Sequence, residues 1–265
     1  CDARVYFNAD AGGDGQWSVA LTESGMGRTS MARHYDDPNI VYAVSSSIVP
    51  GPDFNADGFG DYENGLHAVF RSDDGGRSWA ATVRNSDPDK LNTFLLAYAD
   101  MAFCSLISPY SAGWYNQAIE VDPHDPDVVW VGGMQLYRSD DGGQSFGLAS
   151  YWYTDSSVSG SAGTYMHADI HTLYAPPGSG DLWIGNDGGV WYSDDPHRPT
   201  HTNNTDVCQP KAGGPTYAEL NDGYTTTQFY HGVPYDDGEI YVGGLQDNGT
   251  VWTGSRQWVH GAAGR

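Results

Sequence analysis

The stretch DFNADGFGD, residues 53–61, places oxygen-bearing side chains at alternate positions. Calcium loops use this spacing because alternate residues converge on one hard cation, while a glycine at the sixth position permits a sharp turn. We therefore expect this loop to bind calcium. The expected ligands are the side chains of Asp53, Asn55, Asp57 and Asp61 and the backbone carbonyl of Phe59. A plain acidic turn is the alternative.

The loop departs from an EF-hand at its twelfth position, where Asn64 replaces the usual glutamate. A second stretch, FNADAGGDG at residues 7–15, has a similar composition but lacks the leading aspartate. It is the weaker calcium candidate.

The segment HADIH contains His167, Asp169 and His171 at alternate positions of an expected strand, 167–175. Side chains two residues apart on a strand point to the same side, so these three would share one face. Histidine and carboxylate are common ligands of transition metals. However, His167 and His171 would lie roughly 13 Å apart on a strand, which is too far for one ion. Contact with a ligand, or a wall of hydrogen-bonded side chains, are the alternatives.

Two further loops carry amides and carboxylates, and three aromatic residues lie close to HADIH in the sequence. Amides and carboxylates suit sugar hydroxyls, and aromatic rings can stack on sugar faces. The loop residues are Asn186, Asp187, Gln246, Asp247 and Asn248, and the aromatic ones are Trp152, Tyr153 and Tyr165. The alternative is that Asp and Asn simply cap these loops.

Glycoside hydrolysis needs two carboxylates roughly 5–9.5 Å apart across the scissile bond. Asp169 together with Asp187 or Asp247 could supply such a pair. No spacing in the sequence establishes it. If the protein is an enzyme, we expect these three residues to be catalytic.

The elements that must position these residues form a repeat. The hexapeptide RSDDGG occurs at residues 71–76 and again at 138–143, each time after an alternating apolar strand and before an aromatic residue, Trp79 or Phe146. Asp caps nearby backbone amides and Gly tolerates positive φ, so each copy predicts a hairpin with a tight turn.

Extending this pattern gives four units of four strands. They cover approximately residues 27–83, 116–150, 167–222 and 226–260, and a half unit precedes them at residues 4–21. One short helix is expected within residues 89–103. Repeated four-stranded units of this length are typical of a β-propeller. The fold class is therefore all-β, a propeller region with about four and a half blades, and the chain is expected to be part of a larger propeller.

The two repeats, SDDGGRSW (72–79) and SDDGGQSF (139–146), resemble the Asp-box or BNR repeat, S/T-x-D-x-G-x-T-W/F. That motif occurs in sialidases, sortilin-type receptors and xyloglucanase-like propellers. The segments HADIH, GNDGGV, LNDG, TTQFY and GGLQDNGT resemble a group of secreted bacterial propellers often labelled glycosyl hydrolases. The chain lacks the Arg-Ile-Pro motif and a convincing arginine triad of sialidases.

The resemblance implies that the repeated turn joins the third and fourth strands of a blade and is structural. Its Asp and Ser side chains would hydrogen-bond the turn, and its aromatic residue would enter the core between blades. Asp74 and Asp141 are therefore poor catalytic candidates. The functional face would be the opposite one, which gathers the stretches 113–117, 150–171, 185–189 and 245–249.

The chain has 34 acidic and 12 basic residues and a formal net charge of −22. Such a charge repels phosphate backbones, so nucleic acid is not an expected partner. No apolar run is long enough for a membrane span. The three cysteines, Cys1, Cys104 and Cys208, allow one disulfide whose partners the sequence does not select.

Two functions from different classes follow. The first is a secreted, calcium-stabilised propeller that binds a glycan or an extracellular protein at a surface or in a matrix, alone, as a homo-oligomer or in a larger assembly. The second is a glycoside hydrolase of the xyloglucanase-like propeller type. Both place the protein outside the cell or on its surface.

Overall fold

The computed structural model describes residues 1–10, 14–53, 56, 60–98, 104, 110–152, 164–209, 213–223, 228–234, 241–246, 249–254 and 257–260. The chain forms two compact units, Cys1–Leu220 and Asn221–Arg265.

The first unit contains a two-stranded sheet and three four-stranded antiparallel sheets, which we call blades 1 to 3. The two-stranded sheet pairs β1 (Val5–Phe7) with β2 (Ser18–Leu21). Blade 1 consists of β3 (Met26–Arg33), β4 (Val41–Ser47), β5 (Leu66–Ser72) and β6 (Ala80–Arg84). Blade 2 consists of β7 (Ala118–Val121), β8 (Val129–Gly132), β9 (Leu136–Ser139) and β10 (Gly147–Leu148). Blade 3 consists of β11 (Ile170–Tyr174), β12 (Leu182–Asn186), β13 (Gly189–Ser193) and β14 (Ala218–Glu219).

The second unit is one further antiparallel sheet of four strands. Its strands are β15 (Phe229–Pro234), β16 (Tyr241–Leu245), β17 (Thr250–Gly254) and β18 (Gln257–His260). Every four-stranded sheet among the described residues has its strands in sequence order. The prediction of repeated four-stranded blades is therefore confirmed.

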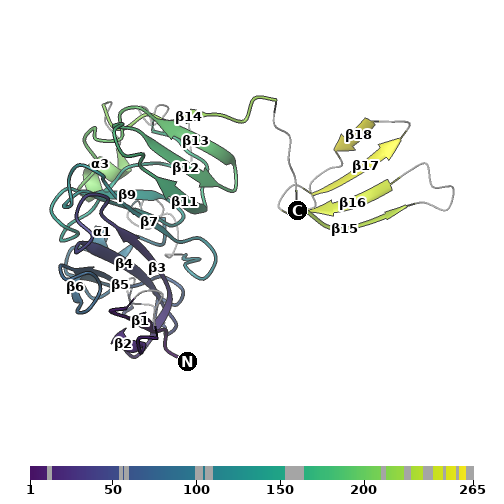
Figure 1. Ribbon diagram of the computed structural model, residues 1–265. Helices are drawn as coiled ribbons and strands as arrows, with labels where there is room; N and C mark the ends of the chain where they lie inside the picture. The colour runs from purple at the N-terminus through teal and green to yellow at the C-terminus, as the bar shows by residue number, and fades with distance from the viewer. Residues whose placement is uncertain are drawn as a thin grey trace. The chain divides into compact units, whose positions relative to one another are not determined.

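Blades 1 to 3 pack face to face, with their first strands side by side (Figure 1). Successive side chains of a strand point to opposite faces of its sheet, so alternate residues contact different neighbouring blades. On β8, Val129 and Val131 join an apolar cluster with Tyr42 and Val44 of blade 1. Trp130, between them, joins a separate cluster with Ile184 of blade 3. This arrangement of sequential four-stranded sheets is that of a β-propeller.

The two repeated turns form the same hydrogen bonds. In blade 1, Asp74 Oδ1 accepts from the Ser78 amide at 2.9 Å and Oδ2 accepts from the Ser78 hydroxyl at 2.6 Å. Asp141 and Ser145 repeat these bonds in blade 2, at 2.9 and 2.5 Å. Phe146 is buried in the cluster between blades 1 and 2. The two turns thus have the hydrogen bonds expected of them, and Phe146 enters the core, whereas Trp79 is only partly buried.

Among the described residues, two short helices lie outside the blades. Helix α1 (Lys90–Thr93) begins at the cap residue Asp89, whose side chain accepts from the Leu91 amide, and it falls within the expected helical stretch. Helix α3 (Asn204–Cys208) was not expected. Its last residue forms a disulfide with Cys104, and Cys1 is free. No helix in the described part of the chain is long and apolar enough to cross a membrane.

One half-buried acid lies between blades 2 and 3. Glu120 of β7 accepts a hydrogen bond from the Ala175 amide at 3.3 Å. Burial raises the pKa of its carboxyl from 4.5 to about 7, and this single backbone bond offsets only part of the effect. The folded protein therefore favours the protonated acid over the carboxylate.

Glu120→Gln should change how stability depends on pH. The folded pKa is raised, so the wild-type protein should lose stability as pH rises from about 4.5 to about 7, while the variant should not. Because the side chain is partly solvated, we expect the variant to gain ~1–2 kcal/mol above pH 7 and little near pH 4.5. Urea unfolding at several pH values measures this, with the exposed Glu63→Gln as control. An equal gain at every pH would contradict the explanation.

Candidate functional site

Three connections between strands bring polar residues together on one face of the first unit. The β6–β7 connection supplies Trp114, Tyr115 and Asn116, the start of blade 3 supplies Asp169 and His171, and the β12–β13 turn supplies Asp187. We call these six residues the candidate site. It lies on the face that the sequence singled out, where the 113–117 and 185–189 stretches were expected to meet.

Asp187 is the centre of this site. His171 Nε2 lies 2.7 Å from Asp187 Oδ1, with Nε2 as the donor when the carboxyl is ionised. The Tyr115 hydroxyl donates to the same carboxylate, at 3.0 Å to Oδ1 and 3.2 Å to Oδ2. The Tyr115 ring also meets the His171 ring edge-on at 4.8 Å. Residues from blade 3 and from the loop preceding blade 2 therefore fix one carboxylate, whose side chain remains 23% exposed.

Asp169 is the second carboxylate of the site. Its backbone carbonyl accepts from the Asp187 amide at 3.3 Å, and its side chain accepts a hydrogen bond from the Asn116 amide group. Burial and the neighbouring Asp187 carboxylate raise the pKa of Asp169, and the Asn116 bond and the nearby histidines oppose this only in part. The two carboxyl groups thus interact, and Asp169 holds its proton more tightly than an ordinary aspartic acid.

The expected strand 167–175 begins only at Ile170. Asp169 has φ +65°, a left-handed conformation that strand residues do not adopt, so it lies just before the strand. His167, Asp169 and His171 therefore do not alternate along one strand as expected. The exposed His167 ring packs on Gly188, where an added Cβ would lie 2.5 Å from it. The metal alternative gains no support. Among the described residues, no group of three or more His, Cys, Asp and Glu side chains could hold a metal ion.

Asn186 caps its own loop. Its amide group donates to the His167 carbonyl at 2.8 Å, and its Oδ1 accepts from the Gly188 amide at 3.0 Å. Asn186 therefore has hydrogen bonds of the kind that the capping alternative expects, and ligand binding by Asn186 stays a prediction. The same loop presents Asp187 to the site.

Two of the three aromatic residues that sequence reasoning selected, Trp152 and Tyr165, lie against other protein rings. Trp152 contacts Tyr98 at 5.9 Å, and Tyr165 meets Trp191 edge-on at 5.8 Å. In the second unit, the Gln246 amide donates to the Gln228 carbonyl at 2.9 Å. Tyr153, Asp247 and Asn248 lie outside the described residues, so the pairing of Asp169 with Asp247 stays a prediction.

The exposed aromatic residue of the site is Trp114, which sequence reasoning did not name individually. Its side chain is 62% exposed, and its ring lies 5.6 Å from the Tyr115 ring. Arg28 of β3 donates to the backbone carbonyls of both residues and so ties this loop to blade 1. The available signal was the stretch GWYNQ, which combines two large aromatics with amides in one loop.

The calcium loop is described only at its ends. Asp61 and Tyr62 donate their amides to the carbonyls of Pro52 and Pro50, at 3.1 and 2.7 Å, which closes the base of the loop. Asp53 and Asp61 flank this base. Asn55, Asp57 and Phe59 lie outside the described residues, so calcium binding stays a prediction.

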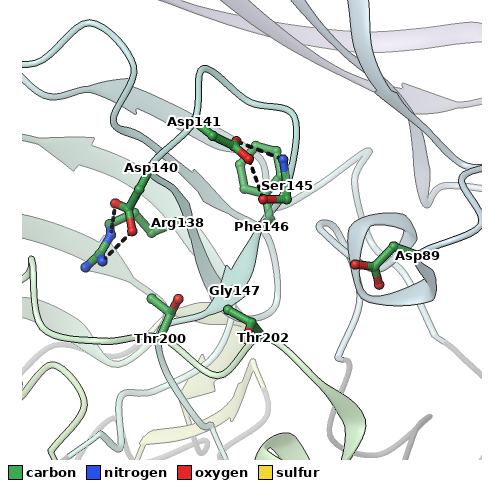
Figure 2. Close-up of a pocket in the computed structure, with 9 residues that line it drawn as sticks. All are labelled: Asp89, Arg138, Asp140, Asp141, Ser145, Phe146, Gly147, Thr200 and Thr202. Atoms are coloured by element: carbon green, nitrogen blue, oxygen red, sulfur yellow. Dashed lines mark hydrogen bonds and ion pairs between the residues drawn. The ribbon is translucent and has the colours of Figure 1, made fainter.

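One pocket lies on the side of the repeated turns, and its acidic side chains have structural roles. Its acidic residues already have partners: Asp89 caps α1, Asp140 pairs with Arg138, and Asp141 bonds Ser145 (Figure 2). The pocket is lined by Asp89, Arg138, Asp140, Asp141, Ser145, Phe146, Gly147, Thr200 and Thr202.

No protein-family model matches the chain, and no curated protein matches it. Solved structures do. A GH74 xyloglucanase from Xanthomonas campestris is 15% identical, with a TM-score of 0.41, over 84% of this chain and 28% of that one. An ancestral GH74 enzyme is 11% identical, with a TM-score of 0.37, over 92% and 26%.

YCF48 from Cyanidioschyzon merolae is 14% identical, with a TM-score of 0.35, over 89% of this chain and 56% of that protein. The chain thus spans little more than a quarter of the two GH74 structures. The strand order and the packing of the blades identify this chain as part of a β-propeller.

Proposed function

We propose that the candidate site binds a glycan and that the chain is part of an extracellular carbohydrate-binding propeller. The observation that carries this proposal is the exposed Trp114 ring beside the Tyr115 ring, whose hydroxyl holds the Asp187 carboxylate. A sugar offers an apolar face of C–H groups and a rim of hydroxyls. An exposed indole and a nearby acceptor match these two features.

Asp187 retains capacity for a ligand. A carboxylate has about four acceptor positions, and Tyr115 and His171 occupy only part of them. Because both partners hold the carboxylate in one orientation, sugar hydroxyls can be accepted with little further loss of side-chain entropy. The disulfide between Cys104 and Cys208 and the net charge of −22 support a location outside the cytosol.

Trp114→Ala should weaken glycan binding. We expect the dissociation constant for xyloglucan- or cellulose-derived oligosaccharides to rise at least about tenfold, or ~1.4 kcal/mol, because the stacking surface is lost. Isothermal titration calorimetry measures this. Trp17→Ala is the matched control, since Trp17 is 68% exposed and is not part of the site. The proposal fails if the wild type binds none of the oligosaccharides, or if the two variants bind equally well.

A second candidate function is glycoside hydrolysis by Asp169 and Asp187. The raised pKa of Asp169 beside a second carboxylate favours it, because a carboxyl group that keeps its proton can act as the general acid of a hydrolytic pair. Asp169 would protonate the leaving oxygen, and Asp187 would accept a proton from the attacking water. Tyr115 and His171 would orient Asp187.

Under this second proposal, Asp169→Asn and Asp187→Asn should each reduce hydrolysis of the bound oligosaccharide by about 10²-fold or more. The wild-type rate should fall as pH rises through the raised pKa of Asp169, since the acid form is required. Product analysis by mass spectrometry measures the rate, and the exposed Asp194→Asn is the control. Glycan binding without any cleavage would leave the binding proposal intact and reject the enzymatic one.

We further propose that residues 53–61 bind calcium and thereby stabilise blade 1. The alternating oxygen donors and the closed base of the loop support this proposal. Bound calcium would fix the long β4–β5 connection, which lies on the same face as the candidate site.

Calcium should raise the melting temperature of the wild-type protein, because an ion that binds only the folded state stabilises it. The double variant Asp57→Asn, Asp61→Asn should lose most of this shift while melting like the wild type in EGTA. Differential scanning fluorimetry with millimolar CaCl₂, with MgCl₂ as the ion control, tests this. A variant that keeps the full calcium shift would place the ion elsewhere.

A further inference from the structure

The third acidic turn of the chain is interrupted by a long insertion. In blades 1 and 2 the aspartate bonds a serine four residues later. In blade 3 the aspartate is Asp195, and its partner is Thr216, 21 residues later. Thr216 donates its amide at 2.9 Å and its hydroxyl at 3.1 Å to Asp195 Oδ1. Within the insertion, Arg198 also contacts this turn, since its Nε lies 2.6 Å from Asp195 Oδ2. Thr216 closes the turn beyond the insertion, and other inserted residues make contacts elsewhere.

The first part of the insertion lies along the outer edge of blade 2. We call residues 196–209 the strap. His201 and Leu148 of β10 exchange both backbone hydrogen bonds, at 2.8 and 2.9 Å. The buried Arg138 donates to the carbonyls of Pro196 and Arg198, at 2.5 and 2.8 Å. Figure 2 shows Thr200 and Thr202 of the strap beside Gly147. The strap therefore covers a strand edge that would otherwise expose unpaired backbone groups.

The second part of the strap contacts Tyr151, which follows blade 2. The Tyr151 hydroxyl donates to the Val207 carbonyl at 3.1 Å, and its ring meets the His201 ring edge-on at 5.3 Å. The Tyr151 backbone also bonds Thr164 and Met166, both at 2.9 Å. Tyr151 is therefore the anchor of the segment that continues to His167 and Asp169.

One covalent bond fastens the end of the strap. Cys208, the last residue of α3, is bonded to Cys104 in the β6–β7 connection, and both residues are half-buried. All other strap contacts named above are noncovalent and involve few groups. Segments of this kind open locally at a lower free energy than a blade does.

We propose that the Cys104–Cys208 disulfide is a redox-sensitive latch that keeps the strap on the edge of blade 2. A dithiol is the required reductant. One of its thiolates attacks a sulfur of the disulfide and displaces the other cysteine as a thiolate, which takes up a proton. The second thiol of the reagent then resolves the mixed disulfide, so two electrons and two protons yield two cysteine thiols and an oxidised reagent. This latch does not depend on the proposed glycan binding.

Hydrogen exchange followed by mass spectrometry tests the latch in the intact folded protein. After reduction with dithiothreitol, the peptides that contain Leu148 and His201 should exchange at least about tenfold faster, because the edge pairing opens more often. The peptide of β8, Val129–Gly132, should exchange as before. The Cys1→Ser variant should behave identically, which excludes a contribution of the free thiol.

Three results would overturn the latch. The first is unchanged exchange at Leu148 and His201 when intact mass confirms complete reduction. The second is equal acceleration in β8, since the disulfide would then hold the whole blade and not the strap. The third is a disulfide that resists the dithiol under native conditions. A double variant, Cys104→Ser with Cys208→Ser, should reproduce the reduced state without reagent and provides an independent measurement.

Discussion

Blade 2 of this protein buries side chains on both of its faces, and the packing of the neighbouring blades depends on it. Trp130 and its neighbours on β8 alternate between two apolar clusters, so neither face of blade 2 is left to solvent. The approach is so close that a side chain at Gly132 would lie 2.6 Å from Ile170 of blade 3. Hydrophobic burial between blades therefore sets their spacing, and the connections must follow.

The candidate site is a consequence of this spacing. Its residues come from connections that start or end on different blades, and hydrogen bonds across the blade junctions keep them in register. The Ile170 amide donates to the Gly133 carbonyl at 2.8 Å, and the Ser30 hydroxyl donates to the Gln117 carbonyl at 3.2 Å. Tyr115 and Asp187 can meet because the strands beneath them are fixed. A site built this way is preorganised for a ligand.

The sequence predicts what depends on local pattern and misses what depends on contact across the chain. The repeated turns and the blades were predictable because Asp, Gly and an aromatic residue stand at fixed spacing. Asp187 and His171 were predictable as site residues because both lie at or near strand ends. The bond from Arg28 to the Trp114 loop spans 86 residues and leaves no local signal. The left-handed conformation of Asp169, which moves the start of β11 to Ile170, also leaves no local signal in the sequence.

The strap and the disulfide were unpredictable for a related reason. Three cysteines allow several pairings, and only the position of α3 beside the β6–β7 connection selects one. The insertion also hides the third acidic turn, since Asp195 and Thr216 are too far apart in sequence to be read as one motif.

Hydrogen bonds donated to carboxylates explain how so acidic a chain can fold. With 12 basic residues for 34 acidic ones, most carboxylates cannot pair with a cation. Asp74 has no cationic side chain hydrogen-bonded to its carboxylate. Hydrogen bonds from Ser78, Ser72 and backbone amides instead lower its pKa to about 2. Asp195 and Asp187 likewise gather hydroxyl and other side-chain or backbone donors from separate segments.

The same arrangement serves structure and function. In the turns of blades 1 and 2, the carboxylate accepts from donors of its own loop, and in blade 3 Asp195 is held by Ser193, Thr216 and Arg198. At Asp187 the donors are Tyr115 of the β6–β7 connection and His171 of blade 3, and they occupy only part of the acceptor positions. Because a carboxylate accepts from any suitable donor, a sugar hydroxyl can take the place that a serine hydroxyl has in the turns. Under the glycan-binding proposal, the site would use the interaction that stabilises the blades, with the last donor supplied by the ligand.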